Sequence, residues 1–293
     1  MAANLYTHQS ENIFKTWLLM FLFIVLVVGL GYAVAYYFQN ITILYGFIAF
    51  SLIMNIYAYW NSDKVAIKQA HAVPAEKSEY RELHNLVENL AITAGLPKPR
   101  VYIINDSSPN AFATGRNPEH SAIAVTTGLL EILDKSELEG VIAHEMAHIG
   151  NRDILVMSVA VVLAGFIALA TDVLLRGGFS VGDNNRGGAI QFAIVIAISL
   201  VASLFATLLR LAVSRRREYL ADATGALITR YPEGLASALE KLSRNTKPLD
   251  TASKATAHLY ISQPFGARKK LSVLFATHPP VEKRIANLRG LEI

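Results

Sequence analysis

The sequence contains no cysteine among its 293 residues. No disulfide framework can therefore support the fold, and any metal site must take its ligands from His, Asp or Glu. Charge is also scarce, because Asp, Glu, Lys and Arg make up 17% of the chain while hydrophobic residues make up 53%. A typical soluble domain carries more charge and fewer apolar residues, so we expect part of this chain to lie in lipid.

The chain also lacks internal repeats, low-complexity tracts and any stripe of basic residues with aromatic residues between them. The last absence argues against a nucleic-acid partner. A formal net charge of +4 remains. It fits a protein that lies against an anionic membrane surface.

Long apolar runs account for the low charge. They cover residues 17–38, 41–60, 154–175 and 189–209, and Asp172 is the only charged residue within them. Each run has about 20 residues, which is enough for a helix to cross the hydrocarbon core of a bilayer. We therefore expect four membrane spans, with a buried or re-entrant helix as the alternative for the third or fourth run.

The first run is too long for the apolar core of a signal peptide, and it continues through Gln39-Asn40 into the second run. These two runs are expected to form a hairpin anchor. Lys and Arg are frequent in the long polar segments, which places those segments and both termini in the cytoplasm. The predicted organisation is a hairpin anchor at 1–62, catalytic segments at 63–153 and 214–293, and a second membrane hairpin at 154–213.

Local patterns predict the secondary structure of the polar segments. Apolar residues at helical spacing indicate a helix over residues 79–94 that Gly95 ends. Ser136 and Glu139 are spaced as a capping box and predict the start of the next long helix. The expected strands are 100–104, 110–114 and 121–126, and the other expected helices are 129–133, 216–229, 233–245 and 281–288.

That next helix carries the motif His144-Glu145-Met146-Ala147-His148, which has the pattern H-E-x-x-H. Residues four apart share one face of a helix, so both imidazoles can bind one zinc ion. Glu145 can then act as general base for the attacking water. The predicted fold is a mainly α integral membrane protein with about four transmembrane helices and a cytoplasmic α+β, zincin-like catalytic domain with a small sheet.

A catalytic zinc needs a third protein ligand. A third histidine of the metzincin kind is excluded, because Asn151 and Ile154 occupy the positions of its glycine and histidine. A carboxylate must therefore serve, and the candidates are Asp153, Asp172, Glu218, Asp222, Glu233, Glu240 and Glu282. Antiparallel spans bring the segment after the fourth run to the membrane face of the histidines, which favours Glu218 as ligand. Asp222, one turn later, is expected to orient a ligand histidine.

The order of these features resembles the HtpX-type membrane zinc proteases, relatives of the CAAX-prenyl proteases. The resemblance covers H-E-x-x-H, two apolar runs, the sequence R-E-Y-x-A-D at 217–222 and an N-terminal hairpin. It implies one zinc per chain, with Glu218 as ligand and Asp222 beside a ligand. It also implies endoproteolysis of membrane proteins and a role in envelope stress.

The same resemblance suggests two residues that contact the substrate. Asn110 begins a predicted edge strand onto which a peptide could add. His278, in Thr277-His278-Pro279-Pro280, matches a downstream histidine of the prenyl proteases by position. The alternatives are that Asn110 is a turn residue and that His278 is a solvated loop residue.

Two other functions remain to be weighed. A metal-handling transporter would need ionisable residues in the middle of its spans, and three of the four runs have none. An inactive protease relative acting as a scaffold would not need Glu145, which is present. We therefore expect a zinc metalloendopeptidase with membrane-protein or peptide substrates.

Overall fold

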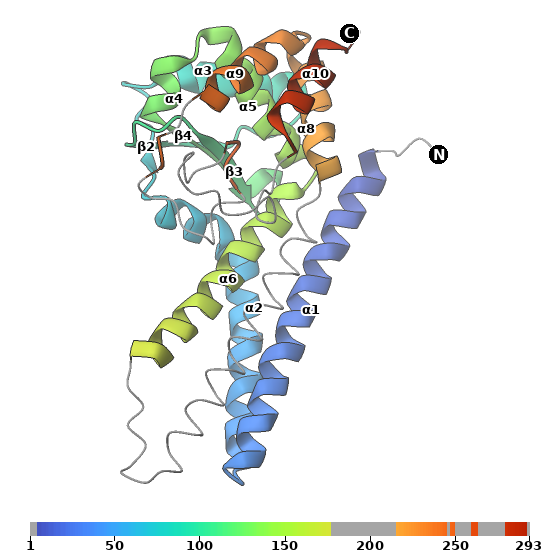
Figure 1. Ribbon diagram of the computed structural model, residues 1–293, viewed down its shortest axis with the longest axis vertical. Helices are drawn as coiled ribbons and strands as arrows, with labels where there is room; N and C mark the ends of the chain where they lie inside the picture. The colour runs from blue at the N-terminus through green and yellow to red at the C-terminus, as the bar shows by residue number, and fades with distance from the viewer. Residues whose placement is uncertain (1–4, 177–214, 245–246, 250–258, 263–278, 292–293) are drawn as a thin grey trace.

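The computed structural model describes residues 5–176, 215–244, 247–249, 259–262 and 279–291. The described part is mainly helical and contains a small mixed sheet (Figure 1). This confirms the mainly helical character and the small sheet of the predicted fold. Predicted helices and strands occur throughout this part, and most of their ends agree with the predictions within two residues.

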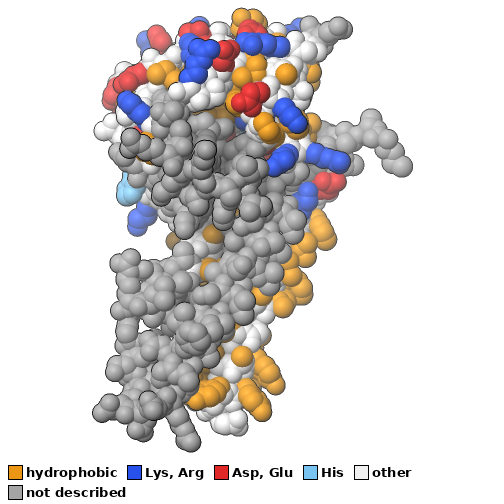
Figure 2. Space-filling view, in the orientation of Figure 1, with side chains coloured by type: hydrophobic (Ala, Val, Ile, Leu, Met, Phe, Trp, Pro, Cys, Tyr) orange, Lys and Arg blue, Asp and Glu red, His pale blue; other side chains and the backbone are white. Residues whose placement is uncertain are grey.

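Two long helices form the stem of the molecule in Figure 1, α1 (Leu5–Tyr37) and α2 (Ile41–Gln69). Between them the side chain of Asn40 accepts a hydrogen bond from the Thr42 N–H and caps α2. Both helices are long and apolar enough to cross a membrane. Large apolar side chains point outward along them, among them Phe14, Trp17, Phe21, Tyr36, Tyr45, Ile53 and Ile56, and Figure 2 shows hydrophobic side chains along this stem.

The third apolar run forms α6 (Asp153–Arg176), which follows α5 (Lys135–Gly150) after a sharp bend. The two helices meet at 83° and qualify as a membrane span only if the bent pair is counted as one. The fourth run lies outside the described residues. The number of four spans therefore stays a prediction.

The sheet has the order β1-β2-β4-β3. Strand β2 (Arg100–Ile104) pairs parallel to β4 (Ser121–Thr126), whereas β1 (Val73–Pro74) and β3 (Ala111–Gly115) are antiparallel to their neighbours. Gly115 closes the β3–β4 connection with φ of 145°, and a Cβ there would lie 2.4 Å from the His120 carbonyl oxygen. Strand β3 is thus an edge strand next to α5.

Both faces of the sheet are buried because helices cover each one. Alternate residues such as Val101, Ile123 and Val125 pack against a cluster that includes α3 (Arg81–Ala94), α5 and α9 (Pro232–Arg244). Phe112 and Ala124 point to the opposite face, where they pack against the C-terminal end of α2 and the N-terminal part of α6. The sheet therefore connects the membrane helices to the helices that carry the candidate site.

The start of α5 differs from the predicted capping box at Ser136 and Glu139, which was wrong by two residues. The Asp134 side chain accepts from the Glu137 N–H, and the Glu137 carboxylate accepts from the Asp134 N–H. Glu137 also accepts hydrogen bonds from Ser237 and Lys241, each at 2.6 Å. These contacts tie the beginning of α5 to α9, and this tertiary contact favours Asp134 over Ser136 as the cap.

Candidate metal centre

The two motif histidines lie on one face of α5, as their spacing predicts. Their Nε2 atoms are 3.2 Å apart, and the rings meet edge to face with centroids 4.7 Å apart. Both side chains are buried, with exposed fractions of 1% and 5% for His144 and His148. At this distance the two nitrogens can share a proton or, through both lone pairs, bind one cation.

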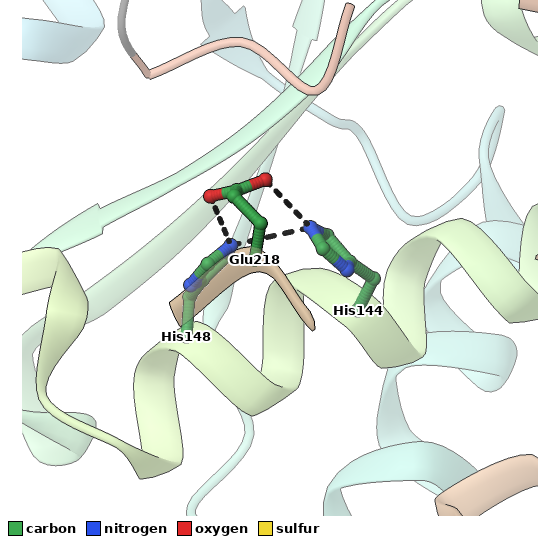
Figure 3. A group of neighbouring side chains, drawn as sticks. All are labelled: His144, His148 and Glu218. Atoms are coloured by element: carbon green, nitrogen blue, oxygen red, sulfur yellow. Dashed lines mark hydrogen bonds and ion pairs between the residues drawn. The ribbon is translucent and has the colours of Figure 1, made fainter. Parts of the chain in front are cut away.

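The third donor comes from α8 (Arg215–Thr229), which crosses α5 at the histidines. Glu218 directs its carboxylate at the pair, with 3.7 Å from Oε1 to His148 Nε2 and 3.9 Å from Oε2 to His144 Nε2 (Figure 3). One ligand atom from each residue lies within 4.8 Å of the others. The crossing is close because Gly225 has no side chain. A Cβ there would lie 3.0 Å from the backbone nitrogen of His144.

The donor set fits a tetrahedral zinc ion. Two imidazole nitrogens and one carboxylate oxygen are the ligands of many catalytic zinc sites, in which neighbouring ligand atoms are roughly 3.3 Å apart. The observed separations of 3.2 to 3.9 Å are close to that spacing. The three residues could therefore hold one metal ion.

Each imidazole meets a carboxylate at its other nitrogen. Asp153 Oδ2 lies 2.9 Å from His148 Nδ1 and accepts its hydrogen bond. Asp222 Oδ1 lies 3.0 Å from His144 Nδ1, off the line of an aligned hydrogen bond. A carboxylate at Nδ1 holds the ring proton there and leaves the Nε2 lone pair for a metal.

Arg284, on α10 (Val281–Arg289), borders the same site. Its guanidinium donates to both oxygens of Asp222, at 2.8 and 2.6 Å, and lies 3.7 Å from Glu218. Burial alone would raise the pKa of Asp222, but the adjacent His144 ring and the hydrogen bonds from Arg284 outweigh it and hold that pKa below its usual value. Asp222 is therefore charged beside His144.

Glu145 is buried between the histidines and the edge strand. Its carboxylate accepts a backbone hydrogen bond from Ala113 in β3. Burial raises the pKa of Glu145, and the nearby histidines offset part of that rise. A carboxylate with a raised pKa is suited to accept a proton and return it near neutral pH.

Burial by itself would lower the pKa of His148, but the hydrogen bond to Asp153 and the charges of Glu218 and Asp153 raise it to about 9. The metal-free protein therefore holds a proton on this ring at neutral pH. A metal ion at Nε2 must displace that proton.

Asn110 is fully buried at the start of β3, and its side chain bonds to another segment. Its Nδ2 donates to the Ser262 carbonyl at 3.1 Å, and its Oδ1 accepts from the Ser262 N–H at 3.2 Å. The Ile261 N–H donates to the Ala111 carbonyl beside it. Residues 261–262 thus lie along the edge where a substrate strand was expected to add. His278 lies outside the described residues.

The sequence did not point to Asp153 or Arg284 as residues that support the ligands. Asp153 was one of the carboxylates considered as a zinc ligand, and in the structure the bend after Gly150 returns it to the Nδ1 side of the His148 ring instead. Gly150-Asn151 was the available signal, since it marked a place where the helix could end. Arg284 had no local signal, because its position depends on how α10 packs.

Two facing histidines with a glutamate between them, and a carboxylate from a second helix, define the class of zinc-type metallopeptidases. A family model described as peptidase family M48 matches residues 77–292. This chain belongs to peptidase family M48, in its HtpX-type branch of membrane metalloproteases, and is a peptide hydrolase.

The similar proteins span distant organisms. A protein named Protease HtpX homolog from Caldanaerobacter subterraneus subsp. tengcongensis is 49% identical over 298 residues, 99% of each chain. One of the same name from Pyrococcus furiosus is 47% identical over 280 residues, 94% of this chain and 95% of the relative. The crystal structure of S. mikatae Ste24p aligns with a TM-score of 0.52 and 19% identity, over 97% of this chain and 67% of that one. This likeness supports the fold.

Proposed function

We propose that the chain is a zinc-dependent endopeptidase that cleaves membrane proteins, with His144, His148 and Glu218 as the zinc ligands. The carrying observation is that three buried donor atoms on two helices lie within 4.8 Å of one another. The charge of the site supports it. Glu145, Asp153, Glu218 and Asp222 are buried there, and the buried arginines beside them are Arg217 and Arg284. These carboxylates outnumber the guanidinium groups by two, so one divalent cation would neutralise the excess once it has displaced the proton of His148.

In the proposed reaction, bound zinc supplies Lewis-acid polarisation of a water molecule and of the scissile carbonyl. Glu145 takes the proton of the attacking water and later donates it to the leaving amine. Asp153 and Asp222 hold the imidazole rings in the tautomer with Nε2 free. The peptide would lie along the edge of β3. At the start of that strand it would take the place of Ile261 and Ser262, which contact Ala111 and Asn110. Asn110 and His278 remain proposed contacts of the substrate carbonyl.

We also propose the location. Two apolar helices and the membrane proteases among the relatives support an integral membrane protein. The distribution of Lys and Arg favours a multi-pass protein of the bacterial inner membrane with both termini and the catalytic segments in the cytoplasm. The family match begins at residue 77, after α2, which fits an anchor at 1–62 followed by catalytic segments at 63–153 and 214–293 around a second hairpin at 154–213. A role in envelope stress is proposed only from the resemblance to the HtpX-type proteases.

The decisive experiment separates metal binding from catalysis. Detergent-solubilised Glu145→Ala should keep one zinc per chain and lose self-cleavage and cleavage of an added membrane protein. Glu139→Ala, a half-buried glutamate of the same helix, is the matched control and should retain both. Cleavage by Glu145→Ala at the wild-type rate would exclude Glu145 as the base, and wild-type protein without stoichiometric metal would exclude the zinc site.

A further inference from the structure

The first membrane helix enters the metal centre. Asn12 lies in the polar first turns of α1, ahead of the apolar run at 17–38, and is 3% exposed. Its Nδ2 donates to Asp153 Oδ1 at 2.7 Å and to the Asn151 carbonyl at 2.9 Å. A buried amide is costly unless it is hydrogen-bonded, and these bonds are to a segment about 140 residues away in sequence.

Asp153 uses its two oxygens for different partners. Oδ2 accepts from His148 Nδ1, while Oδ1 accepts from Asn12 and lies 3.6 Å from Arg217 Nη1. Arg217 also approaches Asn12 Oδ1 at 3.4 Å and directly precedes Glu218. The α1, α5–α6 and α8 segments therefore meet around one fully buried carboxylate.

The chain around Asp153 needs this support. Asp153 follows the 83° bend, where Arg152 adopts a left-handed backbone with φ of 61°. Backbone hydrogen bonds at the joint, such as the one from the Arg152 N–H to the Ile149 carbonyl, fix the main chain but not the Asp153 side chain. Contacts from another helix therefore help to set the direction of its carboxylate. In Figure 1 the start of α1 lies at the same height as the start of α8, and the rest of α1 runs along α2.

We propose that Asp153 orients His148 for metal binding and that Asn12 is the positioning residue that holds Asp153. The N-terminal membrane helix is then a part of the metal centre in addition to being an anchor. This inference rests on the proposed function, because it concerns the same zinc site.

The test measures metal binding rather than activity alone. Detergent-solubilised full-length variants are titrated with Zn²⁺ against a chromophoric chelator, and the visible spectrum of the Co²⁺-substituted protein reports the ligand geometry. Loss of a residue that orients a ligand costs about 10–100-fold in metal affinity, which is the loss expected for Asp153→Asn. Asn12→Ala should lower the zinc affinity several-fold and change the Co²⁺ spectrum in the same direction as Asp153→Asn does.

The matched control is Gln9→Ala. Gln9 lies one turn before Asn12 and donates to the Gly150 carbonyl at 2.8 Å, so it docks α1 on the same joint without touching Asp153. Zinc affinity and the Co²⁺ spectrum should stay as in wild type. An equal loss in Gln9→Ala and Asn12→Ala would mean that α1 acts only by docking, and would overturn the role of Asn12.

A second variant guards against misfolding. Asn12→Asp keeps the shape of the side chain and removes its donor, and should weaken zinc as Asn12→Ala does. Wild-type zinc affinity and Co²⁺ spectra in Asp153→Asn and in both Asn12 variants would overturn the inference while leaving the zinc site intact. If the wild-type protein itself binds no stoichiometric zinc, or if His144→Ala binds it equally well, the proposed function fails instead.

Discussion

The two histidines of α5 are held from opposite ends of the chain. His144 faces Asp222, whose two oxygens are both bonded by Arg284 from the last described helix. His148 faces Asp153, which is bonded by Asn12 from the first helix. We call each histidine with its facing carboxylate and the residues that support it an arm of the site. In the His144 arm a guanidinium bonds the carboxylate directly, whereas in the His148 arm a neutral amide bonds it and the nearest guanidinium, of Arg217, is 3.6 Å away. The difference means that similar ligands can respond differently to pH and to the loss of a supporting residue.

The ligand common to both arms should give the largest effect. Glu218→Ala removes the carboxylate that faces both Nε2 atoms. Zinc affinity should fall by more than the roughly 100-fold expected for loss of an orienting residue. Equilibrium competition with a chelator measures it, and Glu233→Ala, an exposed carboxylate on α9, is the control. If Asp222→Ala weakens zinc more than Glu218→Ala does, the two roles are exchanged.

The His148 arm should make zinc binding depend on pH. Its pKa of about 9 in the metal-free fold lies above the ordinary value of 6.5, so zinc must displace a proton below pH 9. Affinity should rise with pH by up to about tenfold per unit and level off near pH 9. The proton also stabilises the metal-free fold fully below pH 6.5, and this stabilisation is lost as pH rises through 9.

Calorimetric zinc titrations in buffers of different ionisation enthalpy would count the released protons. Asp153→Asn removes the largest influence that raises the pKa of His148, so it should flatten the pH dependence. The same change at Asp222, beside the other ring, should flatten it less. Equal flattening by both variants would contradict the difference between the arms.

Sequence reasoning could predict the parts of this centre that depend on residues close together in the chain, and it missed parts that depend on contacts between distant segments. His144, Glu145 and His148 were predictable because helical spacing alone places them together, and Glu218 because antiparallel helices return the chain to the same level. The strands at 100–104 and 121–126 followed from local apolar pattern. Asn12 and Arg284 were not predictable, because their positions depend on two helix dockings that no local pattern encodes. The position of Asp153 depends on the bend, for which Gly150-Asn151 gave a place but no direction.

The His144 arm should be the more sensitive to loss of its supporting charge. Arg284→Met leaves Asp222 buried without its bidentate partner, and breaking a buried ion pair costs about 3–5 kcal/mol. We expect a clear fall in Tm and about a tenfold loss of zinc affinity. Asn12→Ala should lower Tm less. Arg289→Ala, on the exposed side of the same α10 helix, should leave both unchanged. A similar Tm for the two arginine variants would contradict the importance of the buried pair.

The smallest effect should come from the crossing of α8 on α5, which serves both arms equally. A methyl group at Gly225 would lie 3.0 Å from the backbone nitrogen of His144 and 3.1 Å from its Cα. Gly225→Ala must therefore move α8 by a few tenths of an ångström. Overpacking of this kind costs about 1–3 kcal/mol. Since Glu218 moves with α8, zinc affinity should fall a few-fold with an unchanged pH dependence. Leu227→Ala, exposed on the same helix, is the control. If Gly225→Ala lowers Tm but leaves zinc affinity as in wild type, Glu218 reaches the histidines without this close crossing.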